Sequence, residues 1–319
     1  MGTPSSCTFL LPGRTDAAAR FYVHVSFGMV LLLFLTAYLR THAQSYEKLE
    51  TLTGHRMEVH FSAGAEAKAE RIARQLDKVM GYYQQQFSFS PDVILLVLSP
   101  EHWTQYTLGE IYGMPHYASN RTLNIAANDN PFWKSFIPQP DKVSAEFFEL
   151  VKEAYTDGKG GLTMEPFFDL LAIHELGHAY HIQDSLVKQR KWMGELFANM
   201  VLHTYIAERE PQHLKALTTF PKMVLSTTQM STLKYTSLPD FETHYNELGQ
   251  EYPQNYGWYQ CGLHIAAANI YDDAGPAAVK DLRMTLRNQR SLLDDAGLNS
   301  LLVENVRSVA EIPLKWKFR

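Results

Sequence analysis

Two histidines four residues apart, with a carboxylate beside the first, constrain the fold of this chain more than any other feature. They are His174 and His178 in the string His-Glu-Leu-Gly-His, and Glu175 follows His174 directly. An α-helix turns once every 3.6 residues, so the two imidazoles project from nearly one face, about one turn apart. On a helix, this spacing can hold one metal ion and leaves Glu175 beside it, free to handle a proton.

The residues before the motif indicate that this helix is buried. Phe167, Leu170 and Leu171 follow Pro166 at helical spacing, which places the motif within an apolar helix. A buried group of histidines and glutamate without a metal ion would be costly, because polar groups in apolar surroundings need partners. We therefore predict one bound Zn²⁺ ion. The alternative is a chance occurrence of the pattern.

A catalytic zinc site needs a third protein ligand, with the fourth position left to water. Asp184 lies where a metzincin would place its last ligand, but that arrangement requires a glycine at position 181. His181 is there instead, and its β-carbon disfavours the required positive φ. Glu195 is the stronger candidate, because it opens a second helix, Trp192 to Asn199, that can pack antiparallel to the first across a loop.

Further polar residues lie close to these candidates in the sequence. Asn199 follows Glu195 by one helical turn, so its amide oxygen could accept the outer N–H of a zinc-bound histidine and fix its tautomer. An ordinary solvated helix residue is the alternative for Asn199. His203 and His181 are predicted to be packing histidines rather than ligands.

A second string follows the histidine pair in the sequence: Trp192-x-x-Glu195-x-Phe197-Ala198. Together with His174-Glu-x-x-His178, it resembles the gluzincin zinc metallopeptidases, in particular the catalytic domain of zinc aminopeptidases and their smaller thermolysin-like relatives. The resemblance covers roughly residues 90 to 275. It implies an α+β, thermolysin-like fold, in which a small mixed sheet and an active-site helix are followed by a mainly helical carboxy-terminal part.

The same family places a tyrosine at the start of a later helix, in a Tyr-x-x-Gly context. Tyr259-Gln-Cys-Gly262 fits this description. The resemblance therefore implies that the phenol of Tyr259 stabilises an oxyanion beside the zinc ion. Tyr256 is the second choice for this role and His264 the third. For each tyrosine, the alternative is an aromatic residue that packs the start of a helix.

The chain also departs from the large aminopeptidases. Sixteen residues separate His178 from Glu195, fewer than is usual there. Gly194 stands where an asparagine is common, and Asn199 supplies an amide where thermolysin-like enzymes often have a carboxylate. No Gly-x-Met-Glu-Asn segment, which would supply an acidic residue for a substrate amino terminus, is present. Trimming of amino termini is therefore not predicted.

The resemblance implies the hydrolysis of peptide bonds. His174, His178 and Glu195 would hold zinc, which lowers the pKa of a bound water molecule, and Glu175 would act as general base and then protonate the leaving amine. A second hypothesis is a zinc-stabilised binding protein at the cell envelope, an inactive homologue of a peptidase. This hypothesis is consistent with the absence of an acidic residue for a substrate amino terminus and with the neutral side chain of Asn199.

Residues 1–43 are predicted to be a leader that exports the chain. The segment Phe21 to Leu39 lacks charged side chains and follows Arg14 and Arg20, as in a signal peptide or a signal anchor. Small residues up to Ala43 suit cleavage after that position. The competing interpretation is an uncleaved membrane helix over residues 21–39. Both interpretations predict a periplasmic or extracellular protein.

The composition excludes some classes of partner. The net charge of −5 and the absence of a polybasic stretch exclude nucleic acid, so the expected partner is a peptide or protein substrate. Cys7 lies in the leader and Cys261 is the only other cysteine. No cysteine-based metal site can therefore form, and a cleaved product can have no intrachain disulfide.

Hydrophobic patterning predicts an α/β part over residues 44–160 and a mainly helical part over 161–319 that carries the zinc site. The break between them is expected at Gly158 to Gly161. Residues 117–127 are expected to form the strand above the cleft, where an extended peptide could pair. Strands are predicted at 57–61, 93–98, 122–127 and 314–318, and helices at 65–86, 165–183, 192–208, 213–223, 256–273, 277–288 and 300–309.

Overall fold

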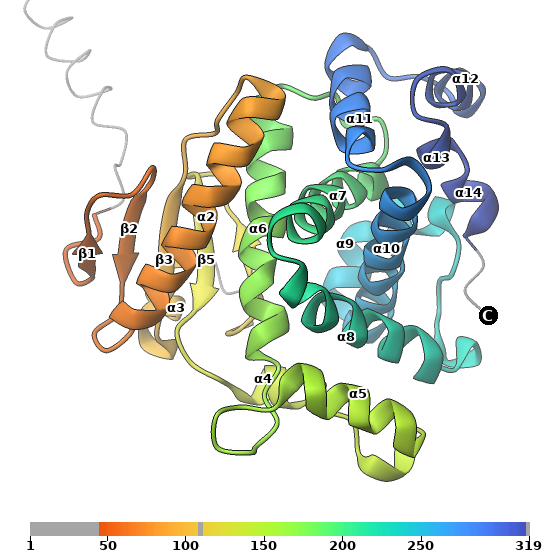
Figure 1. The fold of residues 1–319 in the computed structure, drawn as a ribbon. Helices are drawn as coiled ribbons and strands as arrows, with labels where there is room; N and C mark the ends of the chain where they lie inside the picture. Colours follow the sequence, from red (N-terminus) through yellow and green to blue (C-terminus); the bar gives the residue numbers. More distant parts are fainter. Residues whose placement is uncertain (1–44, 108–110, 317–319) are drawn as a thin grey trace, which may run out of the picture. The chain divides into compact units, whose positions relative to one another are not determined.

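The computed structural model describes residues 45–107 and 111–316. The predicted leader, residues 1–43 with its apolar segment 21–39, lies outside the described residues. From Lys48 onward the chain forms one compact unit, in which a small sheet is joined to a larger set of helices (Figure 1). The predicted α+β class is confirmed. Within the described ranges, no helix has both the length and the apolar character required to cross a bilayer.

The sheet has five strands and is mixed. The three inner strands run parallel, and each edge strand is antiparallel to its neighbour. Every residue of the central strand β3 is buried, as its continuous apolar sequence predicts for a parallel strand. In spatial order the strands are β1 (Glu50–Leu52), β2 (Glu58–Phe61), β3 (Ile94–Leu98), β5 (Thr122–Ala126) and β4 (His116–Tyr117).

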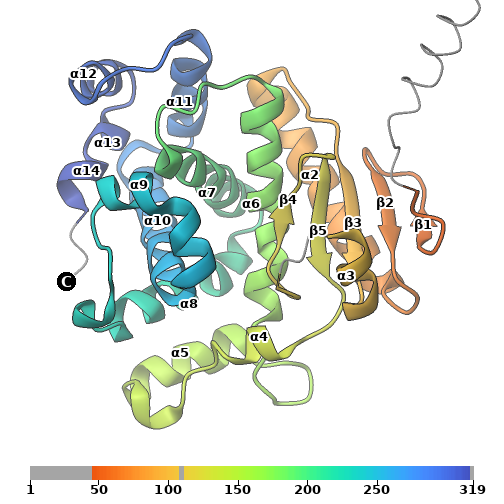
Figure 2. The same cartoon turned by 180° about the vertical axis from the view of Figure 1, so that it is seen from behind.

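The segment predicted as the cleft strand, residues 117–127, is divided by a turn. Arg121 has a positive φ of 70°, and the Ala118 N–H donates to the Thr122 carbonyl at 2.9 Å, so the chain reverses between β4 and β5. The outer strand on this side of the sheet is therefore β4 rather than β5 (Figure 2). With two residues, β4 is too short to show the alternation by which a strand is predicted from sequence.

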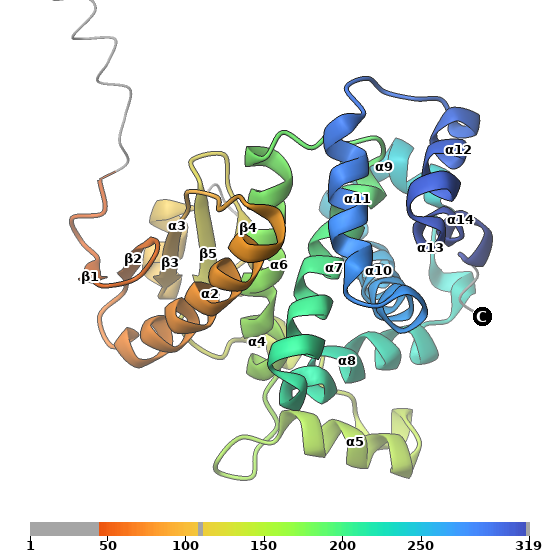
Figure 3. The same cartoon turned by 45° about the horizontal axis from the view of Figure 1, so that its top comes forward.

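The helix that carries the histidine pair, α6 (Glu165–Gln183), has the bounds predicted from the sequence. It packs against β4 and β5 on one side and against α7 (Lys191–Arg209) and α8 (Leu214–Thr227) on the other. Figure 3 shows α6 between the sheet and α7. Phe167 and Leu170 are each only 3% exposed, which confirms the prediction that this helix is buried.

Both ends of α6 are fixed to the rest of the unit. Near its start, the ring of Phe168 stacks on that of Trp133, with 5.1 Å between the ring centroids. At its end, Gln183 exchanges two hydrogen bonds with the backbone of Asp92, of 2.7 and 2.8 Å. Asp92 lies two residues before β3, so α6 is held against the sheet. Side chains on α6 consequently have a well-defined position relative to the sheet.

The remaining helices surround α6 and α7 or cover the sheet; α2, for example, packs on β2 and β3. Three short 3-10 helices span Pro140–Lys142, Pro211–His213 and Met230–Thr232. The remaining α-helices are α2 (Glu66–Phe87), α3 (Pro100–Tyr106), α4 (Pro131–Lys134), α5 (Ala145–Tyr155), α9 (Leu238–Glu251), α10 (Pro253–Ala274), α11 (Ala277–Asn288), α12 (Asp295–Asn305), α13 (Arg307–Ala310) and α14 (Ile312–Lys315).

Some predicted elements differ from those observed. The strand predicted at 314–318 is wrong, because residues 314 and 315 belong to the short helix α14, whose first turn contains Pro313. The predicted break at Gly158 to Gly161 is a tight turn, closed by a 2.7 Å hydrogen bond from Asp157 N–H to the Gly161 carbonyl. Helices α5 and α9 are not among the predicted elements, although Ser144 and Ser237 cap them as N-cap residues should.

Candidate metal centre

Helices α6 and α7 come into backbone contact at Gly177 and Ala198. A Cβ atom on Gly177 would lie 2.7 Å from the Cα atom of Ala198, which is closer than non-bonded carbon atoms approach. Only glycine therefore fits at this position of the His-Glu-Leu-Gly-His string. Because Glu195 precedes Ala198 by about one turn, the close approach brings Glu195 to the face of α6 that carries the two histidines.

The side chains of His174, His178 and Glu195 converge on one point. The two Nε2 atoms are 3.0 Å apart, and Oε2 of Glu195 lies 3.4 Å from each of them. Two donor atoms bound at 2.0–2.1 Å to a tetrahedral ion are about 3.3 Å apart, so the three atoms have nearly the separations that one such ion requires. Within the described residues, no other group of three histidine, cysteine, aspartate or glutamate side chains is arranged in this way.

Asn199 fixes the tautomer of His174. Its Oδ1 atom lies 2.8 Å from Nδ1 of His174, and an amide oxygen can only accept, so Nδ1 must carry the proton. The lone pair of His174 Nε2 then points to the convergence point, as a metal ligand requires. The predicted hydrogen bond is confirmed, and the alternative is wrong, because Asn199 is fully buried. Asn199 therefore leaves Nε2 as the ring nitrogen of His174 that faces the convergence point.

The second oxygen of Glu195 has a different partner. The hydroxyl of Tyr245, on α9, donates to Oε1 of Glu195 at 2.8 Å. Tyr245 is not among the residues that the sequence predicts for the site. The signal that could have located it is the start of α9, where Ser237 and Asp240 form a capping box. That signal predicts a helix, but it does not predict which side chain of the helix faces Glu195.

The charges at the cluster influence one another. Burial alone would lower the pKa of His178, but the neighbouring Glu195 carboxylate outweighs it and raises that pKa. Burial would raise the pKa of Glu195, but the two histidines hold it well below its ordinary value. Burial, together with Glu195, raises the pKa of Tyr245 far above the usual range. The carboxylate is therefore ionised at neutral pH, and the phenol keeps the proton that it donates.

Glu175 faces the edge of the sheet. Its Oε2 atom accepts the backbone N–H of Tyr117, in β4, at 2.8 Å. Glu175 is 7% exposed, and it lies close enough to His178 for its charge to help raise the pKa of that imidazole. The carboxylate is thus shared between the metal cluster and the outermost strand. This is the place at which a base could act on a molecule bound between them.

The structure does not support the prediction for Tyr259. Its hydroxyl donates to the backbone carbonyl of Ser237 at 2.8 Å, and its ring stacks on Trp316 with 5.9 Å between centroids. The side chain of Tyr259 therefore lies in the core and attaches α10 to its neighbours. The second choice, Tyr256, lies three residues earlier, on a neighbouring face of α10. Its hydroxyl is 3.5 Å from that of Tyr245, so Tyr256 belongs to the surroundings of Glu195.

The alternative third ligand, Asp184, is placed elsewhere. It ends α6 and lies 2.5 Å from Nη2 of Arg283, on α11. Because both partners are buried, Asp184 is committed to a structural ion pair that joins α6 to α11. Of the two candidates for the third ligand, Glu195 rather than Asp184 lies with the histidine pair.

Three further histidines, His264, His203 and His181, are not part of the cluster. The ring of His264 stacks on that of His174, with 5.9 Å between centroids. His203 packs on the ring of Tyr271. His181 is 2% exposed and packs on Phe197, as predicted. Two of its ring atoms would lie 3.4 Å from a Cβ atom at position 194, so His181 also lies beside Gly194 on α7.

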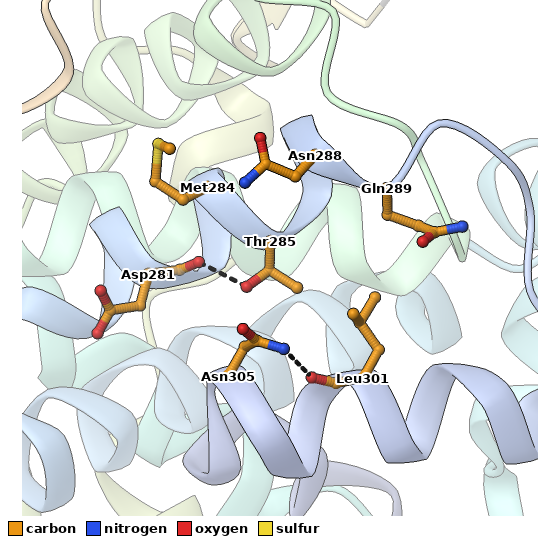
Figure 4. Close-up of a pocket in the computed structure, with 7 residues that line it drawn as sticks. All are labelled: Asp281, Met284, Thr285, Asn288, Gln289, Leu301 and Asn305. Carbon is orange, nitrogen blue, oxygen red and sulfur yellow. Dashed lines mark hydrogen bonds between the residues drawn. The ribbon is translucent and has the colours of Figure 1, made fainter.

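A separate cavity of about 260 Å³ lies between α11 and α12 (Figure 4). Two of the polar side chains that line it are bonded within their own helices: Thr285 donates to the Asp281 carbonyl and Asn305 to the Leu301 carbonyl, each at 2.8 Å. The lining contains one carboxylate, that of Asp281, and no histidine. It is therefore not a second candidate metal site.

Comparison with known proteins adds no relative: no protein-family model, no curated protein and no solved structure matches this chain. The geometry of the cluster and of its surroundings is accordingly the basis for a function.

Proposed function

We propose that this protein is an exported zinc metallopeptidase of the gluzincin type, with a thermolysin-like fold, that hydrolyses peptide bonds in peptides or proteins. One observation carries the proposal: His174, His178 and Glu195 converge on one point, while Glu175 beside them is bonded to an edge strand. Two imidazoles and one carboxylate are a donor set that suits zinc and leaves a fourth position open. Export is proposed from the apolar segment 21–39 alone.

The residues of the site have distinct roles in this proposal. Bound zinc would supply a Lewis acid and a water molecule of lowered pKa. Glu175 takes the proton of the attacking water on a carboxylate oxygen and passes it to the leaving amine. Tyr256 takes the place of Tyr259 as the phenol that stabilises the oxyanion, because it lies beside Tyr245 and Glu195 rather than in the core.

The edge strand β4 supports a peptide as the substrate. The N–H of Ala118 points inward to β5, whereas that of Tyr117 points outward to Glu175. An extended peptide can add to such an edge through its own backbone. A substrate carbonyl that accepts the Tyr117 N–H would release Oε2 of Glu175, so that binding of the peptide and readiness of the base are coupled.

The test is hydrolysis of a mixed peptide library by the purified full chain, before and after removal of metal with a chelator. We expect cleavage to stop with chelator and to return with added Zn²⁺. The variant Glu175→Gln should bind one zinc per chain but cleave at least about 100-fold more slowly. Glu304→Gln, which changes an exposed carboxylate on α12, is the matched control and should cleave normally.

Two outcomes would contradict the proposal in different ways. Equal cleavage by Glu175→Gln would exclude Glu175 as the base. One zinc ion per chain without cleavage of any peptide would favour the second hypothesis, a zinc-stabilised binding protein. If the purified protein contained no stoichiometric zinc and took up none when zinc was added, both the peptidase and the binding-protein hypotheses would lose their basis.

A further inference from the structure

The two carboxylate oxygens of Glu195 face different groups. Oε2 is 3.4 Å from the Nε2 atoms of both histidines, whereas Oε1 accepts the Tyr245 hydroxyl at 2.8 Å. A carboxylate that is free to rotate about its last bond can present either oxygen, or both, to a metal ion. Here the rotation is restrained, because turning the group would remove Oε1 from its donor within a buried site.

We propose that Tyr245 is a positioning residue that restrains Glu195 so that Oε2 alone faces the metal ion. This inference rests on the metal site of the proposed function, although not on peptide hydrolysis. Tyr245 acts on Glu195 as Asn199 acts on His174: each holds the ligand by the atom that does not face the metal. Such outer partners raise the affinity of a site for its metal by orienting the ligands before the metal arrives.

The shape of α9 is consistent with this role. The helix departs from helical geometry at one residue, His244, where φ is −110° and ψ is 18°, and Tyr245 follows it directly. The kink is held in place from one side: the ring of His244 stacks on Tyr235 with 4.1 Å between centroids, and its Nδ1 lies 2.9 Å from Glu247. The kink thus sets the direction in which the side chain of Tyr245 projects from α9.

Helix α9 is also aligned with the start of α7, where Glu195 lies. The N-cap residue Arg190 gives α7 no side-chain cap. Instead, the carboxylate of Glu242, on α9, accepts the Trp192 N–H at 3.1 Å, and its backbone carbonyl accepts Nζ of Lys191 at 2.7 Å. These contacts lie within one turn of Glu195 and three residues before Tyr245. They hold α9 and α7 at the separation at which the Tyr245 hydroxyl can donate to the Glu195 carboxylate.

A third helix supports the phenol. Nε2 of Gln260, on α10, donates to the Tyr256 hydroxyl at 2.8 Å, and the Tyr256 and Tyr245 hydroxyl oxygens are 3.5 Å apart. The rings of Tyr245 and Tyr256 also contact each other, with 5.9 Å between centroids. The Gln260–Tyr256 hydrogen bond and this ring contact therefore support the phenol of Tyr245 from α10.

The test compares the zinc affinities of single variants of the full chain, measured by competition with a chromophoric chelator. Tyr245→Phe removes one oxygen atom and keeps the ring. We expect its zinc dissociation constant to rise about 10–100-fold. In the Co²⁺-loaded protein, the visible absorption band should change, because the carboxylate is free to reorient. Tyr205→Phe, which removes a buried phenol oxygen that donates to Glu210 at the other end of α7, is the matched control and should leave both unchanged.

A second variant tests the proposal in case Tyr245→Phe does not fold. Glu242→Ala removes the acceptor of the Trp192 N–H but leaves the phenol and the Lys191 contact to the backbone carbonyl of residue 242, and it should weaken zinc binding by less than Tyr245→Phe does. If Tyr245→Phe does not fold, as judged by circular dichroism, Glu242→Ala carries the test alone: no weakening overturns the proposal.

The result that overturns the inference is a folded Tyr245→Phe protein whose zinc affinity and Co²⁺ spectrum match those of Tyr205→Phe. If that variant also cleaved peptides more slowly, Tyr245 would be a catalytic phenol rather than a positioning residue. If no variant and no native protein cleaved any peptide, the proposed function would fail, but the comparison of affinities would still decide the role of Tyr245.

Discussion

The α6–α7 pair and the helix α9 both contribute to the candidate metal centre, but they are held in different ways. The pair packs through buried apolar side chains and a direct backbone contact at Gly177. Helix α9 is kinked at His244 and is joined to α7 by polar contacts of Glu242. Ligands therefore lie on the close-packed elements, while an orienting phenol lies on an element with a weaker attachment. The following predictions test this difference, from the largest expected effect to the smallest.

The largest effect is expected where α6 and α7 touch. In Gly177→Ala, the new methyl group meets the backbone of Ala198 at 2.7 Å, so the helices must separate. Over-packing of this kind destabilises by about 1–3 kcal/mol. Because the separation also moves Glu195 away from the histidines, zinc affinity should fall by more than in Tyr245→Phe. Thermal unfolding and chelator competition measure the two effects.

The control for that substitution lies in α9. A Cβ atom on Gly249 would meet nothing within 4 Å, and alanine is the better helix former by about 0.5–1 kcal/mol. Gly249→Ala should therefore leave zinc affinity unchanged and stability equal or higher. Equal losses in the two variants would show that Gly177 is not a special contact.

The next effect concerns the partner of His174. Asn199→Leu keeps a side chain of similar size but removes the acceptor of the Nδ1 proton, so the tautomer of His174 is no longer fixed. Zinc affinity should fall about 10–100-fold, as for Tyr245→Phe. If the two orienting partners act on separate ligands, the losses in the double variant should multiply. If the double variant lost no more zinc affinity than either single variant, Asn199 and Tyr245 would not act independently on their two ligands.

The pH dependence of zinc binding gives a smaller effect. Burial lowers the pKa of His178, but Glu195 outweighs it and raises that pKa above 6.5. Zinc binds only the neutral imidazole, so protons compete with zinc at any pH below the raised pKa. Affinity should therefore increase with pH and level off only above 6.5. A competition titration between about pH 5 and 8 measures this, and levelling off below 6.5 would contradict it.

The smallest predicted effect is in the dynamics. Because α9 is held by fewer buried apolar contacts, its backbone amides should exchange with deuterium faster than those of α6 and α7. Zinc should slow the exchange in the part of α9 around Tyr245, since the bound ion fixes Glu195 and hence its phenol partner. Exchange measured by mass spectrometry with and without zinc tests this. Equal exchange in α6 and α9 would remove the proposed difference between the two regions.

The same difference explains how much the sequence could predict. The bounds of α6 and the ligands His174, His178 and Glu195 depend on helical spacing and apolar neighbours, which are local properties. Asn199 follows from Glu195 by one helical turn. Tyr245, by contrast, follows a kink at His244, which is held by the ring of Tyr235, outside α9, and by Glu247. No spacing along the chain encodes that contact.

Tyr259 and β4 show two other limits of the sequence. The Tyr-x-x-Gly pattern lies inside α10, six residues after its start at Pro253, and it does not specify which face of that helix is turned to the cluster. Tyr256 and Tyr259 are three residues apart and point to different neighbours. The edge strand β4 has two residues, and a segment so short has no periodic pattern to detect.

The central claim is that His174, His178 and Glu195 bind one zinc ion, and a crystal structure of the zinc-loaded protein with anomalous diffraction at the zinc edge tests it most directly. The account predicts one strong anomalous peak about 2.0–2.1 Å from Nε2 of both histidines and from Oε2 of Glu195. No peak at that position, or a peak coordinated by Asp184 instead of Glu195, would contradict it.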